Sequence, residues 1–204
     1  MALLHREMGL TFSQMEVDFV VPDLAQDLPV CIDPFLLFKS TDPTLRDLHT
    51  KVVGVFNYGI ELFCSGRLEE LTRLIDFPEA NEIGFGYTEG AIAGHGLGPN
   101  MEHALSDLLG QVGAIQDRGI RHIEELQLLS VGIGADLISD TVAHLIKSYL
   151  VEYTTTQSKL HNIPTAPMAP LNHYFDFANR EWLDGYFELP LNPRTAAHGS
   201  AAPG

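Results

Sequence analysis

Apolar side chains recur at steps of three and four residues in two long stretches of this chain, a spacing that places them on one face of an α-helix. The first stretch covers residues 45–63, with Pro43 near the predicted first turn and Gly66 at the predicted stop. The second covers residues 138–153 and is closed by Pro164. Two amphipathic helices of this length need a shared core, so the sequence predicts a mostly helical fold.

Shorter patterns complete the expected architecture. Short helices are predicted over residues 68–75 and 121–129, and a further helix is predicted over 100–109. Two runs of β-branched and aromatic residues, 18–24 and 28–38, are interrupted by prolines and predict edge strands or extended segments. The chain is therefore expected to be an α+β protein, predominantly α-helical with a few short strands.

Composition divides the chain into four expected segments. Pro164, Pro167 and Pro170 predict an irregular connector, six aromatic side chains follow between Tyr174 and Phe187, and YFELPL predicts a strand. Such an aromatic cluster needs a partner surface, whereas the last twelve residues hold no large apolar side chain and cannot join a core. The segments are a loose N-terminal segment (1–15), a helical core domain (16–163), a proline- and aromatic-rich extension (164–192) and a disordered tail (193–204).

Acidic side chains outnumber basic ones by 27 to 12, which gives a formal net charge of −15. Such a surface repels nucleic acid phosphates and anionic membranes, so direct nucleic-acid binding by this chain alone is not expected. No stretch approaches the ~18 apolar residues of a membrane-spanning helix, and Arg6 and Glu7 fall where a signal peptide needs apolar residues. We therefore expect a soluble, cytoplasmic protein.

The chain has two cysteines, Cys31 and Cys64, which form no CxxC pair. A disulfide scaffold and a cysteine-rich zinc site are therefore excluded, and a reducing compartment fits. Both cysteines stand among apolar residues and are predicted to lie in the core.

A glycine-rich loop is predicted between the two long helices, with six closely spaced glycines. Its residues Gly94, His95, Gly96 and Gly98 lead towards a predicted helix start, where free amide groups can hold a phosphate. Residues 74–117 contain no Lys or Arg but seven acids, so a structural or gating loop is favoured over a nucleotide site.

Acidic and histidine side chains gather at the start of the second long helix, in GIGADLISDTVAH. Asp136, Ser139, Asp140 and His144 follow steps of three and four residues, so Asp140 and His144 face the same way. Such a set can hold a divalent metal ion or polarise water, with Asp140, His144 and His95 as candidate ligands. The favoured interpretation is that Asp136 or Ser139 caps the helix and Asp140 complements its dipole.

Gln157-Ser158-Lys159 matches the second half of a metal-dependent nuclease core, an acid or glutamine followed by any residue and lysine. It falls at the end of the second helical pattern, where a surface lysine is the simpler interpretation. No GxSxG motif is present. The sequence therefore offers no complete catalytic set.

Four motifs occur in a distinctive order: DPFLLFKS, FPEANEIGFGY with its following glycines, GIGADLISDTVAHLIKSYLVEYT and YFELPLNP. Together they resemble the amino-terminal part of larger, uncharacterised bacterial proteins of the restriction and phage-defence type. In those proteins a nuclease-like domain of the PD-(D/E)xK type lies further along the chain. The resemblance covers about residues 16–192, assigns no catalytic residue, and implies that this chain ends where the nuclease-like domain would begin.

The leading functional expectation is a non-catalytic recognition, regulatory or assembly module of such a defence protein, here in a form that lacks the nuclease. Its aromatic segment, residues 174–187, is the expected contact for a protein partner or for the missing nuclease domain. The alternative is a small divalent-metal-dependent hydrolase that uses Asp136, Asp140 and His144, with His95 brought close. A third expectation is an acidic interaction protein that docks a partner through the aromatic segment.

Overall fold

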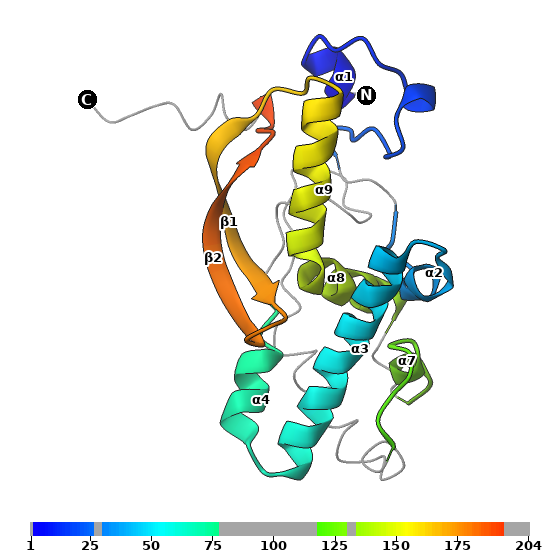
Figure 1. Cartoon of the computed structure of the whole chain (residues 1–204), viewed down its shortest axis with the longest axis vertical. Helices are drawn as coiled ribbons and strands as arrows, with labels where there is room; N and C mark the ends of the chain where they lie inside the picture. Colours follow the sequence, from blue (N-terminus) through cyan, green and yellow to red (C-terminus); the bar gives the residue numbers. More distant parts are fainter. Residues whose placement is uncertain (1, 27–29, 78–117, 130–133, 194–204) are drawn as a thin grey trace, which may run out of the picture.

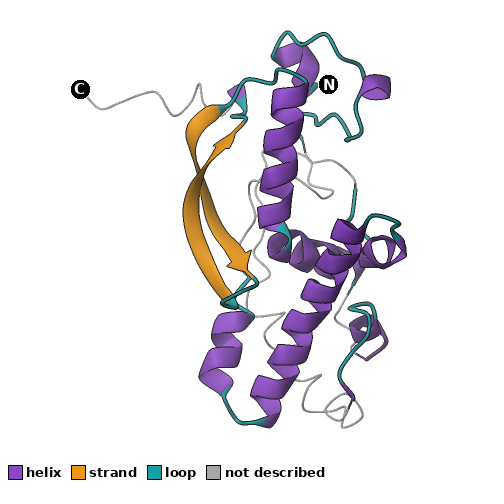
Figure 2. Cartoon of the chain, viewed as in Figure 1, coloured by secondary structure: helices purple, strands orange, loops and turns teal. Residues whose placement is uncertain are grey.

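The computed structural model describes residues 2–26, 30–77, 118–129 and 134–193. This part of the chain contains seven α-helices, one short 3-10 helix and a two-stranded antiparallel sheet, which confirms the predicted α+β, mostly helical class (Figure 2). The elements are α1 (Leu4–Glu7), η1 (Gln14–Glu16), α2 (Pro34–Lys39), α3 (Pro43–Cys64), α4 (Leu68–Leu74), α7 (Glu125–Leu129), α8 (Ala135–Leu145), α9 (Lys147–Leu160), β1 (Ala166–Asp176) and β2 (Glu181–Leu189).

The helix α3 runs between α4 and α7 in the lower half of the view in Figure 1, and its ends follow the sequence signals. Asp42 caps its start by accepting a hydrogen bond from the amide of Thr44, and Pro43 takes the first helical position. Beyond its end, Gly66 adopts a positive φ of 72° that suits glycine. The predicted helix over 45–63 is therefore confirmed, and α4 confirms the short helix predicted next to it.

The main core forms where α3 packs against α2 and α4 and where α8 meets the hairpin of β1 and β2. The hairpin also lies along α9, as Figure 1 shows. The buried apolar residues of this core are Leu48, Val52, Val55, Phe56, Ile60, Leu62, Leu71, Leu74, Phe77, Ile120, Ile123, Leu126, Ile138, Val142, Leu145, Ile146 and Phe175.

The second helical pattern, predicted as one helix, forms two. The helices α8 and α9 meet at Ile146, which ends the first and precedes the second. Ile146 serves both helices, because its amide donates to the Val142 carbonyl and its own carbonyl accepts from the amide of Leu150. Leu145 and Ile146 are both buried. Because the apolar pattern continues through the bend, periodicity could not reveal it.

Neither N-terminal run forms the predicted regular strand, although residues 18–24 are non-helical, as the alternative of an extended segment allows. In the run 28–38, residues from Pro34 onwards form α2, because Asp33 accepts a hydrogen bond from the amide of Phe35 and Pro34 starts the helix. Residues 18–24 contain only an isolated bridge, between Leu3 and Asp23. The cap by Asp33 therefore explains why residues 34–39 form a helix and not a strand. Residues 18–24 have no neighbouring strand among the described residues with which to form a sheet.

The connector predicted around three prolines is instead mostly strand. Pro167 and Pro170 lie within β1, whose only described neighbour is β2. A strand with one open edge tolerates proline, because the missing N–H is not needed on that side. The strand predicted for YFELPL is confirmed as part of β2.

The aromatic segment, residues 174–187, is covered in large part by this chain's own helices. Phe175 is 1% exposed, and Trp182 donates a hydrogen bond from Nε1 to the carbonyl oxygen of Leu74 at 3.1 Å. The Trp182 ring meets Phe77 edge-on. Tyr186, in contrast, stays 66% exposed. The partner surface predicted for this stretch is therefore internal for two of its aromatic residues.

A second, smaller core joins the N-terminal residues to the end of α9. It consists of Leu4, Phe12, Val21 and Ile163. Polar contacts hold the same region together: the Tyr153 hydroxyl donates to Asp18 at 2.7 Å, and the Asn192 side chain donates to the carbonyl oxygen of Leu24 at 3.1 Å.

The two cysteines do not lie in the core. Cys31 and Cys64 are both exposed, and neither forms a disulfide. Cys64 is the last residue of α3, past the buried stripe that ends at Leu62, so the helix turns it outward. Within the described part of the chain, no helix combines the length and the apolar character needed to cross a membrane.

Candidate binding groove

Two side chains from the predicted Asp136, Ser139, Asp140 and His144 group, Ser139 and His144, are buried in α8 and make hydrogen bonds to backbone groups. The Ser139 hydroxyl accepts a hydrogen bond from the amide of Ile32 at 2.8 Å, and Ser139 is 2% exposed. His144 donates from Nδ1 to the backbone carbonyl of Asp140 at 2.8 Å, and its ring is buried near Phe77. The Ser139 hydrogen bond ties α8 to Ile32, in the segment that leads into α2, whereas the His144 hydrogen bond stays within α8.

The helix α8 begins after Gly134, which is its N-cap, and no side chain caps it. The predicted cap by Ser139 is therefore wrong, because this hydroxyl serves a long-range contact. The Asp136 side chain lies outside the described residues.

Several other predictions concern residues without a described structure. The loop residues Gly94, His95, Gly96 and Gly98 and the helix predicted over 100–109 lie outside the described residues. Among the residues that are described, no three His, Cys, Asp or Glu side chains gather in a way that could hold a metal ion. The sequence-predicted ligands Asp140 and His144 are thus not joined by a third described ligand.

An open groove of about 610 Å³ lies between α3, the start of α9 and the closed end of the hairpin. Its size is typical of ligand pockets, which span roughly 300–1,000 Å³. Aromatic and aliphatic side chains make most of its wall, and charged side chains stand among them. The described residues that line it are Lys51, Gly54, Val55, Ser148, Tyr174, Phe175, Asp176, Phe177, Ala178, Arg180 and Leu183.

Arg180, the last residue of the hairpin turn, has a backbone conformation that is unfavourable for a residue other than glycine. Its φ is 58°, in the left-handed region, which costs a non-glycine residue on the order of 1 kcal/mol. The turn imposes this conformation: Asp176 accepts from the amide of Ala178 and from the Asn179 side chain, and the Arg180 amide donates to the Asp176 carbonyl at 2.7 Å. The guanidinium then sits 4.1 Å from the centre of the Tyr58 ring.

Lys51 is the second cation of the groove. Its ammonium group lies 2.8 Å from the Asp47 carboxylate and 5.8 Å from the centre of the Phe177 ring. Both partners of this ion pair are about half exposed, at 46% and 58%, so the pair is solvated and the lysine keeps hydrogen-bonding capacity for a further acceptor.

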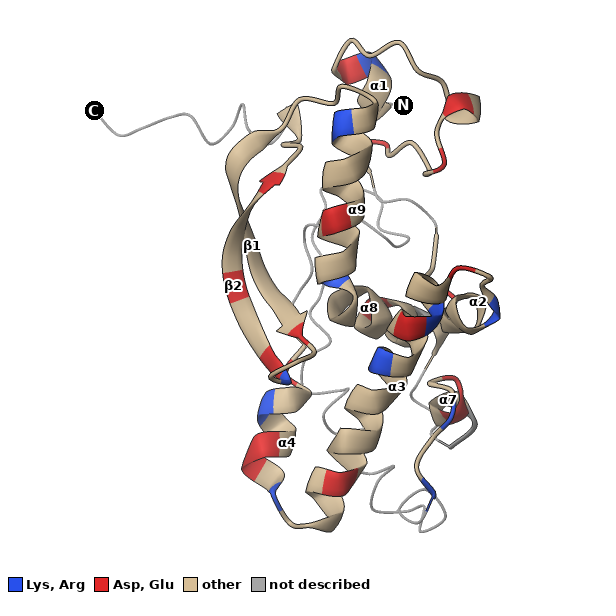
Figure 3. Ribbon diagram, in the orientation of Figure 1, with Lys and Arg blue, Asp and Glu red and all other residues tan. Residues whose placement is uncertain are grey.

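The lining of the groove is less acidic than the chain as a whole, although Asp47, which pairs with Lys51, adds a carboxylate beside it. The described lining holds two cations, Lys51 and Arg180, and one acid, Asp176. The chain as a whole has 12 basic and 27 acidic side chains, and Figure 3 shows the acidic ones spread over the helices and the hairpin. Hydrogen bonds from Ala178 and Asn179 lower the pKa of Asp176, so this carboxylate stays ionised and occupied by the turn.

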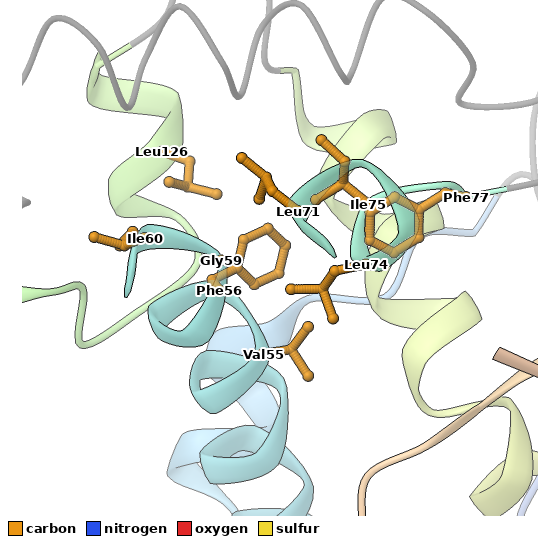
Figure 4. A pocket seen from close by; sticks show the side chains of 9 residues that line it. All are labelled: Val55, Phe56, Gly59, Ile60, Leu71, Leu74, Ile75, Phe77 and Leu126. Carbon is orange, nitrogen blue, oxygen red and sulfur yellow. The ribbon is translucent and has the colours of Figure 1, made fainter. Parts of the chain in front are cut away.

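A second hollow belongs to the core. Nine apolar or glycine residues of α3, α4, α7 and the chain after α4 surround a cavity of about 20 Å³ (Figure 4). It has the size of a single water molecule and no polar partner for one, so it is a packing gap and not a ligand site. Its lining is Val55, Phe56, Gly59, Ile60, Leu71, Leu74, Ile75, Phe77 and Leu126.

A histidine pair joins α3 to the segment before α7. His49 Nε2 lies 3.2 Å from His122 Nδ1. The Phe38 ring packs against both histidine rings. Burial lowers the pKa of His49, His122 lowers it further, and the Glu124 carboxylate acts in the opposite direction. The two histidines are 73 positions apart, so no spacing rule could have paired them.

Sequence reasoning also missed both groove cations. Lys51 lies inside the predicted helix over 45–63 as an ordinary exposed residue, and Arg180 follows a turn sequence whose geometry is set by Asp176. The one local signal was an arginine at the end of a tight turn, where glycine or asparagine is favoured.

Comparison with known proteins places the chain in a family. A search of curated proteins found no match, and a search of solved structures found none either. A family model described as "Domain of unknown function (DUF8370)" matches residues 9–198, which is nearly the whole chain. The chain therefore belongs to the DUF8370 family.

Proposed function

We propose that this chain is a non-catalytic recognition or regulatory module of a bacterial restriction- or defence-type protein, acting beside a nuclease-like domain. The observation that carries the proposal is the open groove between α3 and the hairpin. It has the volume, the apolar walls and the few convergent charges of a binding site. The association with defence proteins is supported by the order of the four sequence motifs.

The way α8 is built also supports a binding role over a catalytic one. A general acid or base must reach its substrate, but the His144 ring is 3% exposed and its Nδ1 is bonded to the helix backbone. Ser139 is committed to the amide of Ile32. The rival proposal, a divalent-metal-dependent hydrolase using Asp136, Asp140 and His144, would have to bring its substrate to the buried His144 ring.

Activity assays separate the two proposals. We expect the purified chain to leave linear and supercoiled DNA intact in Mg²⁺ or Mn²⁺, and to behave like its Asp140→Asn and His144→Gln variants. Cleavage by the wild-type chain that disappears in Asp140→Asn would overturn the binding proposal and support the hydrolase. Metal analysis gives an independent readout, since stoichiometric metal lost in Asp140→Asn would favour the enzyme.

The partner side of the proposal needs a positive test. The nuclease-like domain of a longer protein that carries the same four motifs can be supplied as a separate chain. Size-exclusion chromatography with light scattering should then show a complex, and DNA cleavage by that domain should change when the module is added. Separate elution together with unchanged cleavage would count against a regulatory role.

A further inference from the structure

We infer that the groove between α3 and the hairpin binds an acidic peptide segment, with Arg180 and Lys51 receiving its carboxylates. This inference rests on the proposed function and names the partner chemistry of the same groove. It follows from the charge of the lining, from the backbone conformation of Arg180 and from the absence of a side chain at Gly54.

The hairpin turn presents the Arg180 side chain from a strained backbone position. A glycine at this position would adopt the positive φ of 58° without strain, yet the chain has an arginine there. Tyr58 holds the guanidinium by its ring face at 4.1 Å, a contact that leaves the planar edge with its N–H donors open. An arginine presented in this way can receive a carboxylate by two parallel hydrogen bonds.

Gly54 keeps the floor of the groove clear. It lies in the interior of α3, where glycine costs about 1 kcal/mol relative to alanine. A Cβ atom built on it would meet nothing within 4 Å, so no neighbouring side chain requires a glycine. Its position on the groove lining is the feature that distinguishes it, because any larger side chain would project into the space.

The charges favour an acidic peptide over a nucleic acid. A nucleic acid strand carries one phosphate per nucleotide and needs several cations along its path. The described lining supplies two, on a chain whose net charge is −15. Two cations separated by an aromatic and aliphatic wall instead suit a short segment that alternates carboxylates with apolar side chains. The rings of Tyr174 and Phe177 give those apolar side chains a surface.

Two variants test the groove without endangering the fold. Arg180→Gly removes the guanidinium and relieves the backbone strain, so the loss of one ring contact is offset. Gly54→Leu places a bulky side chain on the groove lining and raises helix propensity. Asn162→Gly, at another positive φ of 54°, and Lys159→Gln, an exposed charge outside the groove, serve as matched controls.

The full chain is used to select from a random-sequence peptide display library, and the selected peptides are measured by fluorescence anisotropy. We expect peptides rich in Asp and Glu beside apolar residues. Their affinity should fall about tenfold or more in Arg180→Gly, a smaller amount in Lys51→Gln, and below detection in Gly54→Leu. Both control variants should bind like the wild type, and replacing Glu by Gln in the peptide should abolish binding.

The inference is overturned if acidic peptides are not enriched, or if Arg180→Gly and Gly54→Leu select and bind the same peptides as the wild type. Oligothymidylate that binds more tightly than the peptides and loses affinity in Arg180→Gly would also overturn it, in favour of a nucleic-acid site. Neither result bears on DNA cleavage or on assembly with the nuclease-like domain. Failure of the peptide is therefore distinguishable from failure of the module proposal.

Discussion

Single residues set backbone geometry at several points of this fold. Gly119 has a positive φ of 68° where the chain passes the side of α3. There the Asn57 side chain accepts from the amide of Ile120 at 2.8 Å and donates to its carbonyl at 3.0 Å, as a neighbouring strand would. These two hydrogen bonds from Asn57, here called the amide clamp, fix the segment that leads to His122 and α7. Residue 119 must lack a side chain, because a Cβ atom there would collide with Asn57.

Replacing Gly119 by alanine is expected to destabilise the protein by about 2 kcal/mol or more. The new Cβ would lie 2.4 Å from Asn57 Oδ1, and it would also strain the positive φ. Urea denaturation monitored by circular dichroism measures the change. As a control, Gly54→Ala has open space around its Cβ and should gain about 0.5–1 kcal/mol. Equal stabilities of Gly119→Ala and wild type would show that the clamp moves freely.

Gly59 offers the opposite case, a glycine whose replacement should help. It lies in the interior of α3 and lines the small apolar cavity. A Cβ there would meet Leu71 Cδ1 at 3.4 Å and Leu74 Cδ2 at 3.6 Å, both ordinary contact distances. Gly59→Ala is therefore expected to stabilise the protein by about 0.5–1 kcal/mol, seen as a higher urea midpoint. A lower midpoint would mean that α4 cannot accommodate the methyl group.

At the scale of elements, the sequence predicts those helices and strands whose ends are marked by nearby capping or turn residues. It does not predict the elements whose ends depend on distant contacts. Asp42, Pro43 and Gly66 define α3 within its own neighbourhood, so its prediction holds. The predicted helix over 121–129 shortens to α7, because the Glu125 carboxylate accepts from the amides of Arg121 and His122 and holds the preceding residues in a turn. Burial raises the pKa of Glu125, and these two amides together with Arg118 lower it by more.

The contact between α3 and the segment before α7 should depend on pH through His49. Its pKa is lowered in the folded protein, mainly by burial, from an unfolded value of about 6.5. Between the two values the unfolded chain binds more protons, so the free energy of unfolding rises with pH across that window and levels off above about 6.5. Acidification from neutral pH towards the folded pKa should therefore destabilise the protein.

Urea denaturation at a series of pH values measures this slope. His49→Gln should reduce the slope of unfolding free energy against pH. His173→Gln, which replaces a half-exposed histidine of the hairpin, should leave that slope unchanged. A slope that survives unchanged in His49→Gln would assign the pH dependence to other groups.

At the scale of the whole molecule, two apolar cores are joined along α9 and the hairpin. The main core holds the helices around α3, and the smaller one binds the N-terminal residues to Ile163 at the far end of α9. The Thr155 hydroxyl donates to the Glu188 carbonyl at 3.1 Å, which ties α9 to β2 between the two cores. The chain as a whole carries a formal net charge of −15.

The excess negative charge should make the thermal stability of the protein depend on salt concentration. Like charges repel most in the compact state, and ions screen exposed charges over about 10 Å at ~0.1 M ionic strength. Raising NaCl from low concentration to ~0.15 M should therefore increase the melting temperature at pH 7. The measurement is differential scanning fluorimetry, with choline chloride to distinguish screening from sodium binding. A melting temperature that falls with salt would show that ion pairs such as Lys51 with Asp47 outweigh the repulsion.

The sequence by itself determined the mostly helical class, the ends of α3 and the final strand, because caps, turn residues and hydrophobic periodicity act over a few neighbouring positions. The net charge of −15 follows from composition alone, since it does not depend on which residues are neighbours in space. The tertiary structure alone decided that Ser139 and His144 serve packing, that α8 and α9 bend at Ile146, and that the groove forms. Each of these depends on contacts between residues far apart in the chain, such as Arg180 with Tyr58, and no local pattern encodes which distant side chain will be the neighbour.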